Sequence, residues 1–232
     1  MQPAKEKKPI IELKNVWKIY EMGSQQVQAL RGMTIAIMPG EFIAIMGPSG
    51  SGKSTAVNMI GCLDIPTKGA VYLDGKDISH LSEDALAKIR GKKIGFIFQQ
   101  FNLIPVLSAM ENVMLPMTFQ NVPANERKKR ADYLLQLVEL GDRTSHRPTE
   151  LSGGQQQRVA IARALSNDPE VILADEPTGN LDSKTGRIVL EFLKKLNKNE
   201  NKTIIMVTHD IKLAKEADRI AYLKDGQIVD KL

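Results

Sequence analysis

Four short apolar runs in the chain have the length and the β-branched content of strands that are buried on both faces. These runs are Phe42 to Met46, Ile94 to Phe98, Val171 to Ala174 and Ile204 to Val207. Segments with helical periodicity lie between them: Val189, Leu193 and Leu196 recur at i, i+4 and i+7, as do Tyr133, Leu137 and Leu140. Alternating strands and helices predict an α/β fold in which three or more of the runs form a mostly parallel sheet.

The two ends of the chain show a different pattern. Ile11 and Leu13 alternate with polar residues, and the run Val71 to Leu73 leads into Asp74-Gly75. Alternation and an Asp-Gly turn are typical of antiparallel strands, so we expect a small N-terminal antiparallel β subdomain. Asp225-Gly226 predicts a final hairpin by the same reasoning.

The middle of the chain contains no convincing strand between about Asn102 and Ala164. We interpret residues 99–164 as an inserted α-helical subdomain, and residues 1–98 and 165–232 as the core and the antiparallel β region. A length of 232 residues fits a single domain with such an insertion.

Composition excludes several classes of protein. With 42% hydrophobic and 25% charged residues the chain resembles a soluble globular protein. No apolar run approaches the roughly 18 residues of a membrane helix and no apolar segment follows the first lysines, so we expect neither a membrane span nor export. The single cysteine, Cys62, lies in an apolar stretch, which predicts a buried thiol. The net charge of +5 suits nucleic acid, an anionic membrane surface or a polyphosphate, and does not discriminate among them.

Polar residues follow each of the four apolar runs. They are a glycine-rich loop after Met46, Gln99 after Phe98, Asp175-Glu176 after Ala174, and Thr208-His209 after Val207. Ligands bind beyond the carboxyl ends of the strands in open parallel sheets. We therefore expect these residues to converge on one cleft.

The glycine-rich loop carries the strongest local chemistry. Gly47-Pro48-Ser49-Gly50-Ser51-Gly52-Lys53-Ser54 matches G-x-x-x-x-G-K-[ST], and a predicted helix from Thr55 to Ile60 follows. Glycines let backbone N–H groups approach phosphate oxygens, Lys53 can reach the β- and γ-phosphates, and Ser54 can ligate Mg²⁺. The pattern arises by chance in roughly one chain per hundred. By itself it permits a small-molecule kinase, a GTPase, a helicase or a transporter ATPase.

Two adjacent carboxylates end the third run. Asp175 suits Mg²⁺, and Glu176 beyond it can orient the attacking water and accept its proton as general base. The alternative is a pair of exposed acids that open a turn at Pro177. His209 can donate a hydrogen bond to the γ-phosphate or to the water, and the amide oxygen of Gln99 can ligate the metal. Taken singly, a strand-end histidine or glutamine is more often structural.

A second anion-binding helix start follows Leu151. Ser152 is a predicted N-cap, and Gly153 and Gly154 expose backbone donors at the positive end of a helix that contains Val159, Ile161 and Leu165. An ordinary capped helix is the alternative. The full string Leu151 to Gln155 would occur by chance in on the order of one chain in several thousand.

Taken in order along the chain, these motifs resemble those of the ATP-binding-cassette ATPases over practically the entire length. The resemblance implies a P-loop NTPase core, with ATP and Mg²⁺ as ligands. It implies that Tyr20 stacks on adenine, that Asp182 lies in the loop that touches an opposite subunit, and that His209 acts as a switch residue. The implied nucleotide contacts are Gly47, Ser49, Gly50, Ser51, Gly52, Lys53, Ser54, Thr55, Gln99, Ser152, Gly153, Gly154 and Gln155, and the implied metal ligands are Ser54, Gln99 and Asp175.

The resemblance also implies partners. Ser152 and Gly154 would complete the site of a second copy, so that a head-to-tail dimer encloses two ATPs. Asn58 to Asp64, Phe98 to Pro105 and Thr178 to Asp182 resemble the branch that includes lipoprotein-releasing, macrolide-efflux and cell-division ATPases. That branch implies a separate integral membrane subunit, a cytoplasmic location on the inner face of the membrane, and no nucleic acid. The alternatives are a non-transport cassette acting on DNA, on ribosomes or in cell division, and a small-molecule kinase.

Overall fold

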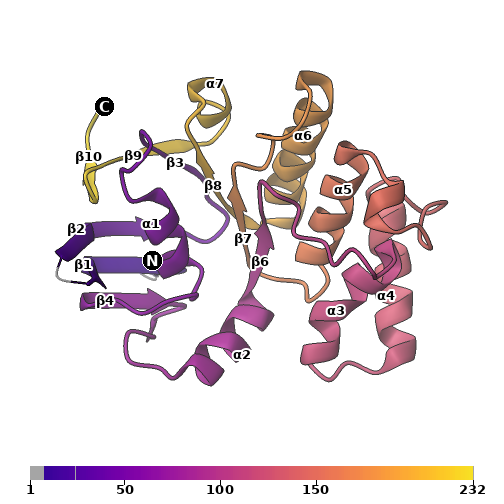
Figure 1. The fold of residues 1–232 in the computed structure, drawn as a ribbon, viewed down its shortest axis with the longest axis horizontal. Coiled ribbons are helices and arrows are strands. Elements are labelled where there is room, and N and C mark those ends of the chain that lie inside the picture. Colours follow the sequence, from indigo (N-terminus) through magenta and orange to yellow (C-terminus); the bar gives the residue numbers. More distant parts are fainter. Residues whose placement is uncertain (1–7, 24, 232) are drawn as a thin grey trace, which may run out of the picture. The chain divides into compact units, whose positions relative to one another are not determined.

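The computed structural model of the protein describes residues 8–23 and 25–231 (Figure 1). The chain divides into two units. The first unit comprises Met1–Ala87 and Asn201–Leu232, and the second comprises Lys88–Glu200. None of the helices in the described part of the chain has the length and apolar composition of a membrane span.

One sheet of the first unit is antiparallel, with the strand order β2-β1-β4-β5. Its strands are β1 (Ile11–Met22), β2 (Gln25–Ile37), β4 (Lys68–Leu73) and β5 (Lys76–Asp77). Ile11 and Leu13 are buried and Lys14 is exposed, so the predicted alternation is confirmed. Asp74 and Gly75 turn the chain between β4 and β5 with φ of 51° and 73°, in the left-handed region that such hairpins require.

The other strands of the first unit include the apolar run Phe42 to Met46, which forms β3. β3 is parallel to β8 and to β9, and β9 pairs antiparallel with β10. The bounds are β3 (Phe42–Met46), β8 (Thr203–Thr208), β9 (Arg219–Lys224) and β10 (Gln227–Val229). The helices α1 (Lys53–Ile60) and α7 (Ile211–Ala214) follow β3 and β8 in the sequence. Cys62 is buried, as predicted.

Helices dominate the second unit, as expected for residues 99–164. The parallel pair β6 (Ile94–Ile97) and β7 (Val171–Asp175) supplies its strands, and the described residues between 99 and 164 contain no strand. Helices α3, α4 and α5 lie side by side (Figure 1). The remaining elements are α2 (Glu83–Lys93), which begins in the first unit, α3 (Ala109–Phe119), α4 (Ala124–Leu137), the 3₁₀ helix η1 (Pro148–Glu150), α5 (Gly153–Ala164) and α6 (Ser183–Glu200).

The unit boundaries differ from the predicted limits of the helical insertion. They fall after Ala87 and Glu200, because β6, β7 and α6 cluster with the helices. The interpretation of residues 99–164 as a separate insertion stays a prediction.

The periodicity of α6 predicted its core face correctly, and the periodicity of α4 did not. Val189, Leu193 and Leu196 are all buried. In α4, by contrast, Tyr133 is 54% exposed and Leu137 is 39% exposed.

The buried face of α4 is instead Ala131, Leu134 and Leu135, followed by Val138 at the C-cap. The helix ends at Leu137, and Glu139 turns the chain with a φ of 59°. Leu140 is therefore buried after the turn and does not continue the predicted helical stripe.

Helix α3 begins with a capping box. The backbone N–H of Ser108 donates to Glu111 Oε2 at 2.8 Å, and the N–H of Glu111 donates to Ser108 Oγ at 3.2 Å. Hydrogen bonds from the backbone and then the hydroxyl of Ser108 lower the pKa of the Glu111 carboxyl. The cap is therefore strongest while Glu111 is ionised.

We expect Ser108→Ala to lower the free energy of unfolding by about 1 kcal/mol at neutral pH, because the cap loses its acceptor. The folded-state pKa of Glu111 is depressed, so its contribution is present at neutral pH and is lost as pH falls through that pKa. Urea unfolding of both proteins at pH 7 and below about pH 4 measures this. A difference between wild type and variant that grew on acidification would contradict the prediction.

Candidate functional site

The loop between β3 and α1 has the backbone that the predicted phosphate loop requires. Gly50 and Gly52 have φ of 78° and 99°. A Cβ atom on Gly52 would lie 2.5 Å from the carbonyl oxygen of Ala29, so no side chain fits there. The carbonyl of Ser51 accepts a hydrogen bond from the N–H of Gly226 at 2.9 Å. Glycine at position 52 and this bond together hold the loop against the antiparallel strands of its own unit.

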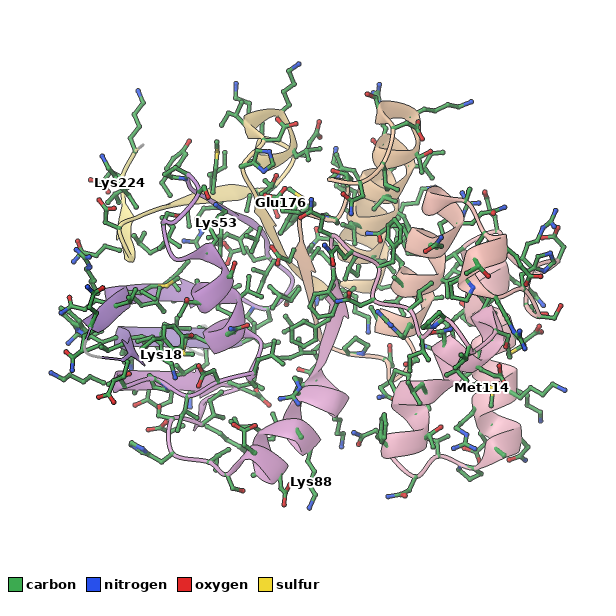
Figure 2. All side chains as sticks on the ribbon, viewed as in Figure 1. Lys18, Lys53, Lys88, Met114, Glu176 and Lys224 are labelled. Atoms are coloured by element: carbon green, nitrogen blue, oxygen red, sulfur yellow. The ribbon has the colours of Figure 1, made fainter. Side chains whose placement is uncertain are left out.

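Positive charge gathers at the start of α1. Gly52 is the N-cap and gives no side-chain cap, and the first turn contains no acidic residue. Lys53 curls back over the loop, where its Nζ donates to the carbonyls of Gly47 at 2.7 Å and Pro48 at 2.8 Å (Figure 2). Both acceptors are neutral, so the ammonium charge and the helix dipole can act together on a phosphate.

The first unit brings His209 to the same sheet edge as this loop. Met46 pairs with Thr208 in the parallel ladder of β3 and β8. Gly47 and His209 therefore leave neighbouring strand ends. The His209 side chain is exposed.

Tyr20 lies on β1 in a small polar cluster. Lys18 Nζ is 2.6 Å from Asp64 Oδ1 and 5.2 Å from the centroid of the Tyr20 ring. The Tyr20 hydroxyl donates to Asp64 Oδ2 at 3.4 Å. The cluster fixes the ring, with a cation over one of its faces. Stacking on adenine stays a prediction.

The second unit brings Gln99 to the residues that follow Glu176. Ile97 pairs with Ala174, so Gln99 and Asp175 leave the same edge of the β6–β7 pair. The side chain of Asn180 donates to the carbonyl of Gln99 at 2.9 Å. A Cβ atom on Gly179 would lie 2.8 Å from Gln99 Nε2, so the glutamine packs directly on this turn.

Glu176 occupies an uncommon backbone conformation. Its φ is 46°, in the left-handed region that residues with a side chain seldom adopt. The N–H of Gly179 donates to the Glu176 carbonyl at 3.0 Å and closes the turn. Such conformations cluster at functional sites because the surroundings must hold them. Figure 2 shows Glu176 where the chain leaves β7.

Ser152 caps α5, as predicted. Its Oγ accepts from the N–H of Gln155 at 3.3 Å, and its N–H donates to Gln155 Oε1 at 2.8 Å. The first turn of α5 contains no acidic residue, and the Ser152 side chain is exposed. The helix start therefore combines a positive dipole end with surface access, which suits an anion from outside the chain.

Asp182 lies beside this helix start. Thr185 Oγ1 donates to Asp182 Oδ2 at 2.6 Å, and the Thr185 N–H donates to Oδ1 at 3.1 Å. The bond from the Thr185 hydroxyl, and to a lesser extent the bond from the Thr185 N–H, lower the pKa of the Asp182 carboxyl. A Cβ atom on Gly154 would lie 2.5 Å from Thr185 Cγ2, so the turn at Asp182 and the start of α5 are in contact.

Two residues of α5 that the sequence did not single out hold neighbouring loops. Gln157 is buried and donates to the carbonyl of Pro177. Arg163 donates to the carbonyls of Phe101, at 2.8 Å, and Asn102. Burial lowers the pKa of Arg163. The sequence could have revealed Gln157, because it is a polar residue on the apolar face of the helix, at i, i+4, i+7 spacing with the buried Ile161 and Ala164.

The predicted metal ligands divide between the units. Ser54 belongs to the first unit, and Gln99 and Asp175 belong to the second. Within the described part of the chain, no group of three or more His, Cys, Asp or Glu could hold a metal ion. Hydroxyl, amide and carboxylate oxygens are nevertheless the donors that Mg²⁺ prefers when phosphates and water complete its shell. The donor types fit Mg²⁺, and a shared ion stays a prediction.

Sequence comparison gives a family and close relatives. The family model described as ABC transporter matches residues 30–179. An uncharacterized ABC transporter ATP-binding protein of Thermotoga maritima is 55% identical over 221 residues, which cover 95% of this chain and 94% of that protein. The macrolide export ATP-binding/permease protein MacB of Brucella melitensis is 51% identical over 221 residues, 95% of this chain and 34% of that protein.

Solved structures agree with the sequence relatives. The dimeric post-hydrolysis state of the ATP-binding cassette MJ0796 bound to ADP and Pi matches with a TM-score of 0.87 and 55% identity, over 94% of this chain and 96% of that chain. MJ0796 comes from Methanocaldococcus jannaschii. CbiO1 of Clostridium perfringens, part of the transporter complex cbiONQ, matches with a TM-score of 0.84 and 30% identity, over 96% of this chain and 87% of that chain.

Proposed function

The chain belongs to the ABC transporter family, and on that premise we propose that it binds Mg-ATP, hydrolyses it to ADP and phosphate, and drives a separate integral membrane subunit. The observation that carries this proposal is the pair of anion-binding helix starts. One has Lys53 on α1, and the other has Ser152 on α5 and no lysine of its own.

Different residues of the chain have different roles in hydrolysis. Lys53 and the N–H groups at the start of α1 hold the β- and γ-phosphates, and Tyr20 stacks on adenine. Glu176 accepts a proton from the water whose oxygen attacks the γ-phosphorus as the bond to ADP breaks, and His209 donates a hydrogen bond to the γ-phosphate. Ser54, Gln99 and Asp175 would hold Mg²⁺, which supplies positive charge against the phosphates.

Two copies would complete each other's sites. In a head-to-tail dimer, the start of α5 in one copy faces the γ-phosphate held by Lys53 in the other. Ser152 to Gln155 then supply donors, and Asp182 lies in the loop that touches the partner. The dimeric MJ0796 structure with ADP and Pi supports this arrangement through its 55% identity to the chain.

The membrane subunit determines where the cassette lies in the cell. We infer that the cassette lies on the cytoplasmic face of the membrane, held there by that subunit, and that it binds no nucleic acid. Phosphate release from Mg-ATP without an added acceptor distinguishes an ATPase from a kinase. Copurification with one integral membrane protein that changes the ATPase rate would support the coupling, whereas stimulation by DNA or ribosomes would contradict it.

Ser152→Asp should lower ATPase turnover at least about tenfold. Aspartate caps a helix as well as serine does, so α5 keeps its start, but a carboxylate now faces the phosphate. Ser108→Asp in the capping box of α3 is the matched control and should retain turnover. Equal rates of phosphate release in the Ser152→Asp variant and the wild type would contradict an anion site at α5.

Mixing two impaired variants tests whether the sites are shared. A heterodimer of the Ser152→Asp and Lys53→Met variants contains one site with an intact lysine loop and an intact α5 start. We expect the mixture to dimerise with ATP more strongly than either variant alone, measured by light scattering. Dimerisation equal to the average of the separate variants would contradict a head-to-tail arrangement.

A further inference from the structure

Gln157 lies on α5, and the function proposed above gives it no role. Its side chain is fully buried, with 0% of its surface exposed. Its Nε2 donates to the carbonyl oxygen of Pro177 at 2.6 Å, and Pro177 directly follows Glu176. A carbonyl only accepts hydrogen bonds, so this contact also fixes the orientation of the amide. One bond therefore joins the helix that begins after Ser152 to the turn that carries Glu176.

The turn after β7 needs such support. Glu176 has a φ of 46°, and a left-handed conformation costs a residue with a side chain roughly 1–2 kcal/mol. Gly179 holds the carbonyl of Glu176, and Gln157 holds the next carbonyl, that of Pro177. The two bonds set the direction in which the Glu176 side chain leaves the backbone.

The other atom of the Gln157 amide argues against a role in packing alone. Its Oε1 is buried and has no hydrogen-bond partner among the described residues. An unpaired buried acceptor costs about 1–3 kcal/mol. Methionine would fill a similar space without that cost, so packing alone does not explain a glutamine at this position.

We propose that Gln157 is a positioning residue for hydrolysis, which transmits phosphate binding at the start of α5 to Glu176 of the same chain. The proposal rests on the proposed function, because it takes Ser152 as an anion site and Glu176 as the general base. Gln157 lies about one and a half turns after Ser152 on a capped helix, so a shift of the helix start moves the Gln157 amide and the Pro177 carbonyl with it. The ATP that α5 contacts in the partner's loop thereby readies the base that acts on the chain's own ATP.

Gln157→Met tests the proposal, since it keeps the length of the side chain and removes its donor. We expect kcat to fall about tenfold or more, because a slightly displaced catalytic group loses that much rate. The KM for ATP should stay nearly unchanged, and the Hill coefficient for ATP should fall toward 1. Gln156→Met is the matched control, because Gln156 Nε2 donates to the Leu151 carbonyl at 3.1 Å and not to the turn at Glu176. It should retain kcat.

A double-mutant cycle with Glu176→Gln separates positioning from general destabilisation. If Gln157 acts through Glu176, the double variant should turn over no more slowly than Glu176→Gln alone. Multiplicative losses, an equal loss in Gln156→Met, or wild-type kcat in Gln157→Met would overturn the proposal. Thermal unfolding with and without ATP shows that each variant is folded and binds nucleotide. Wild-type turnover in Glu176→Gln would instead overturn the proposed function.

Discussion

Glu176→Gln should bind ATP, lose turnover by about 10²- to 10⁴-fold and accumulate as a dimer. The amide has the size of the carboxylate but cannot accept the proton of the attacking water, and general-base catalysis contributes rate on that scale. The lysine loop lies in the other unit of the chain and is unchanged, so ATP binding is retained. With hydrolysis blocked, ATP continues to bridge the two copies.

Phosphate release and gel filtration in Mg-ATP measure the two outcomes for Glu176→Gln. Glu200→Gln, at the exposed end of α6, is the matched control, and it should have the turnover of the wild type and its elution volume in Mg-ATP. Wild-type turnover together with a monomeric elution volume in Glu176→Gln would refute the assignment of the general base.

Lys53→Met should weaken ATP binding by about two orders of magnitude. A hydrogen bond to a charged group contributes about 1.5–3 kcal/mol, which corresponds to a factor of roughly 10 to 150 in affinity. Methionine keeps the length and helix propensity of lysine, so α1 should still form. The loss of affinity should be smaller for ADP, because ADP lacks the γ-phosphate that the Lys53 ammonium contacts in ATP.

Titration calorimetry with ATP and with ADP distinguishes this result from a damaged loop. Lys53 also bonds the carbonyls of Gly47 and Pro48, so a general loosening of the loop would weaken both nucleotides equally. Lys88→Met on α2 removes an exposed lysine and should leave both affinities unchanged (Figure 2). Affinity for ATP within about twofold of the wild type in Lys53→Met would contradict the role of the lysine.

Some of the site was predictable because its geometry depends on near neighbours in the sequence. Glycines at positive φ shape the loop that precedes α1, and Ser152 finds its acceptor and donor within α5 itself. The apolar runs predicted β3, β6, β7 and β8 to within a residue or two, because strands buried on both faces leave few polar positions.

Other features depended on contacts that no local pattern specifies. On α4 two stripes satisfied helical spacing, and packing against α3 and α5 buried Leu134 rather than Tyr133. Both sets of apolar residues have helical spacing, so periodicity alone cannot tell which set is buried. The grouping of β6 and β7 with the helices likewise followed from contacts between distant segments.

By itself, the sequence of this protein determined the lysine-equipped loop, the capped start of α5 and the order of strands and helices, because each follows from residues a few positions apart. The tertiary structure alone decided that His209 leaves the strand beside the loop and that Gln157 holds the carbonyl after Glu176. Those contacts join segments far apart in the chain, and their geometry is set by strand pairing and core packing, which act only once the chain has folded.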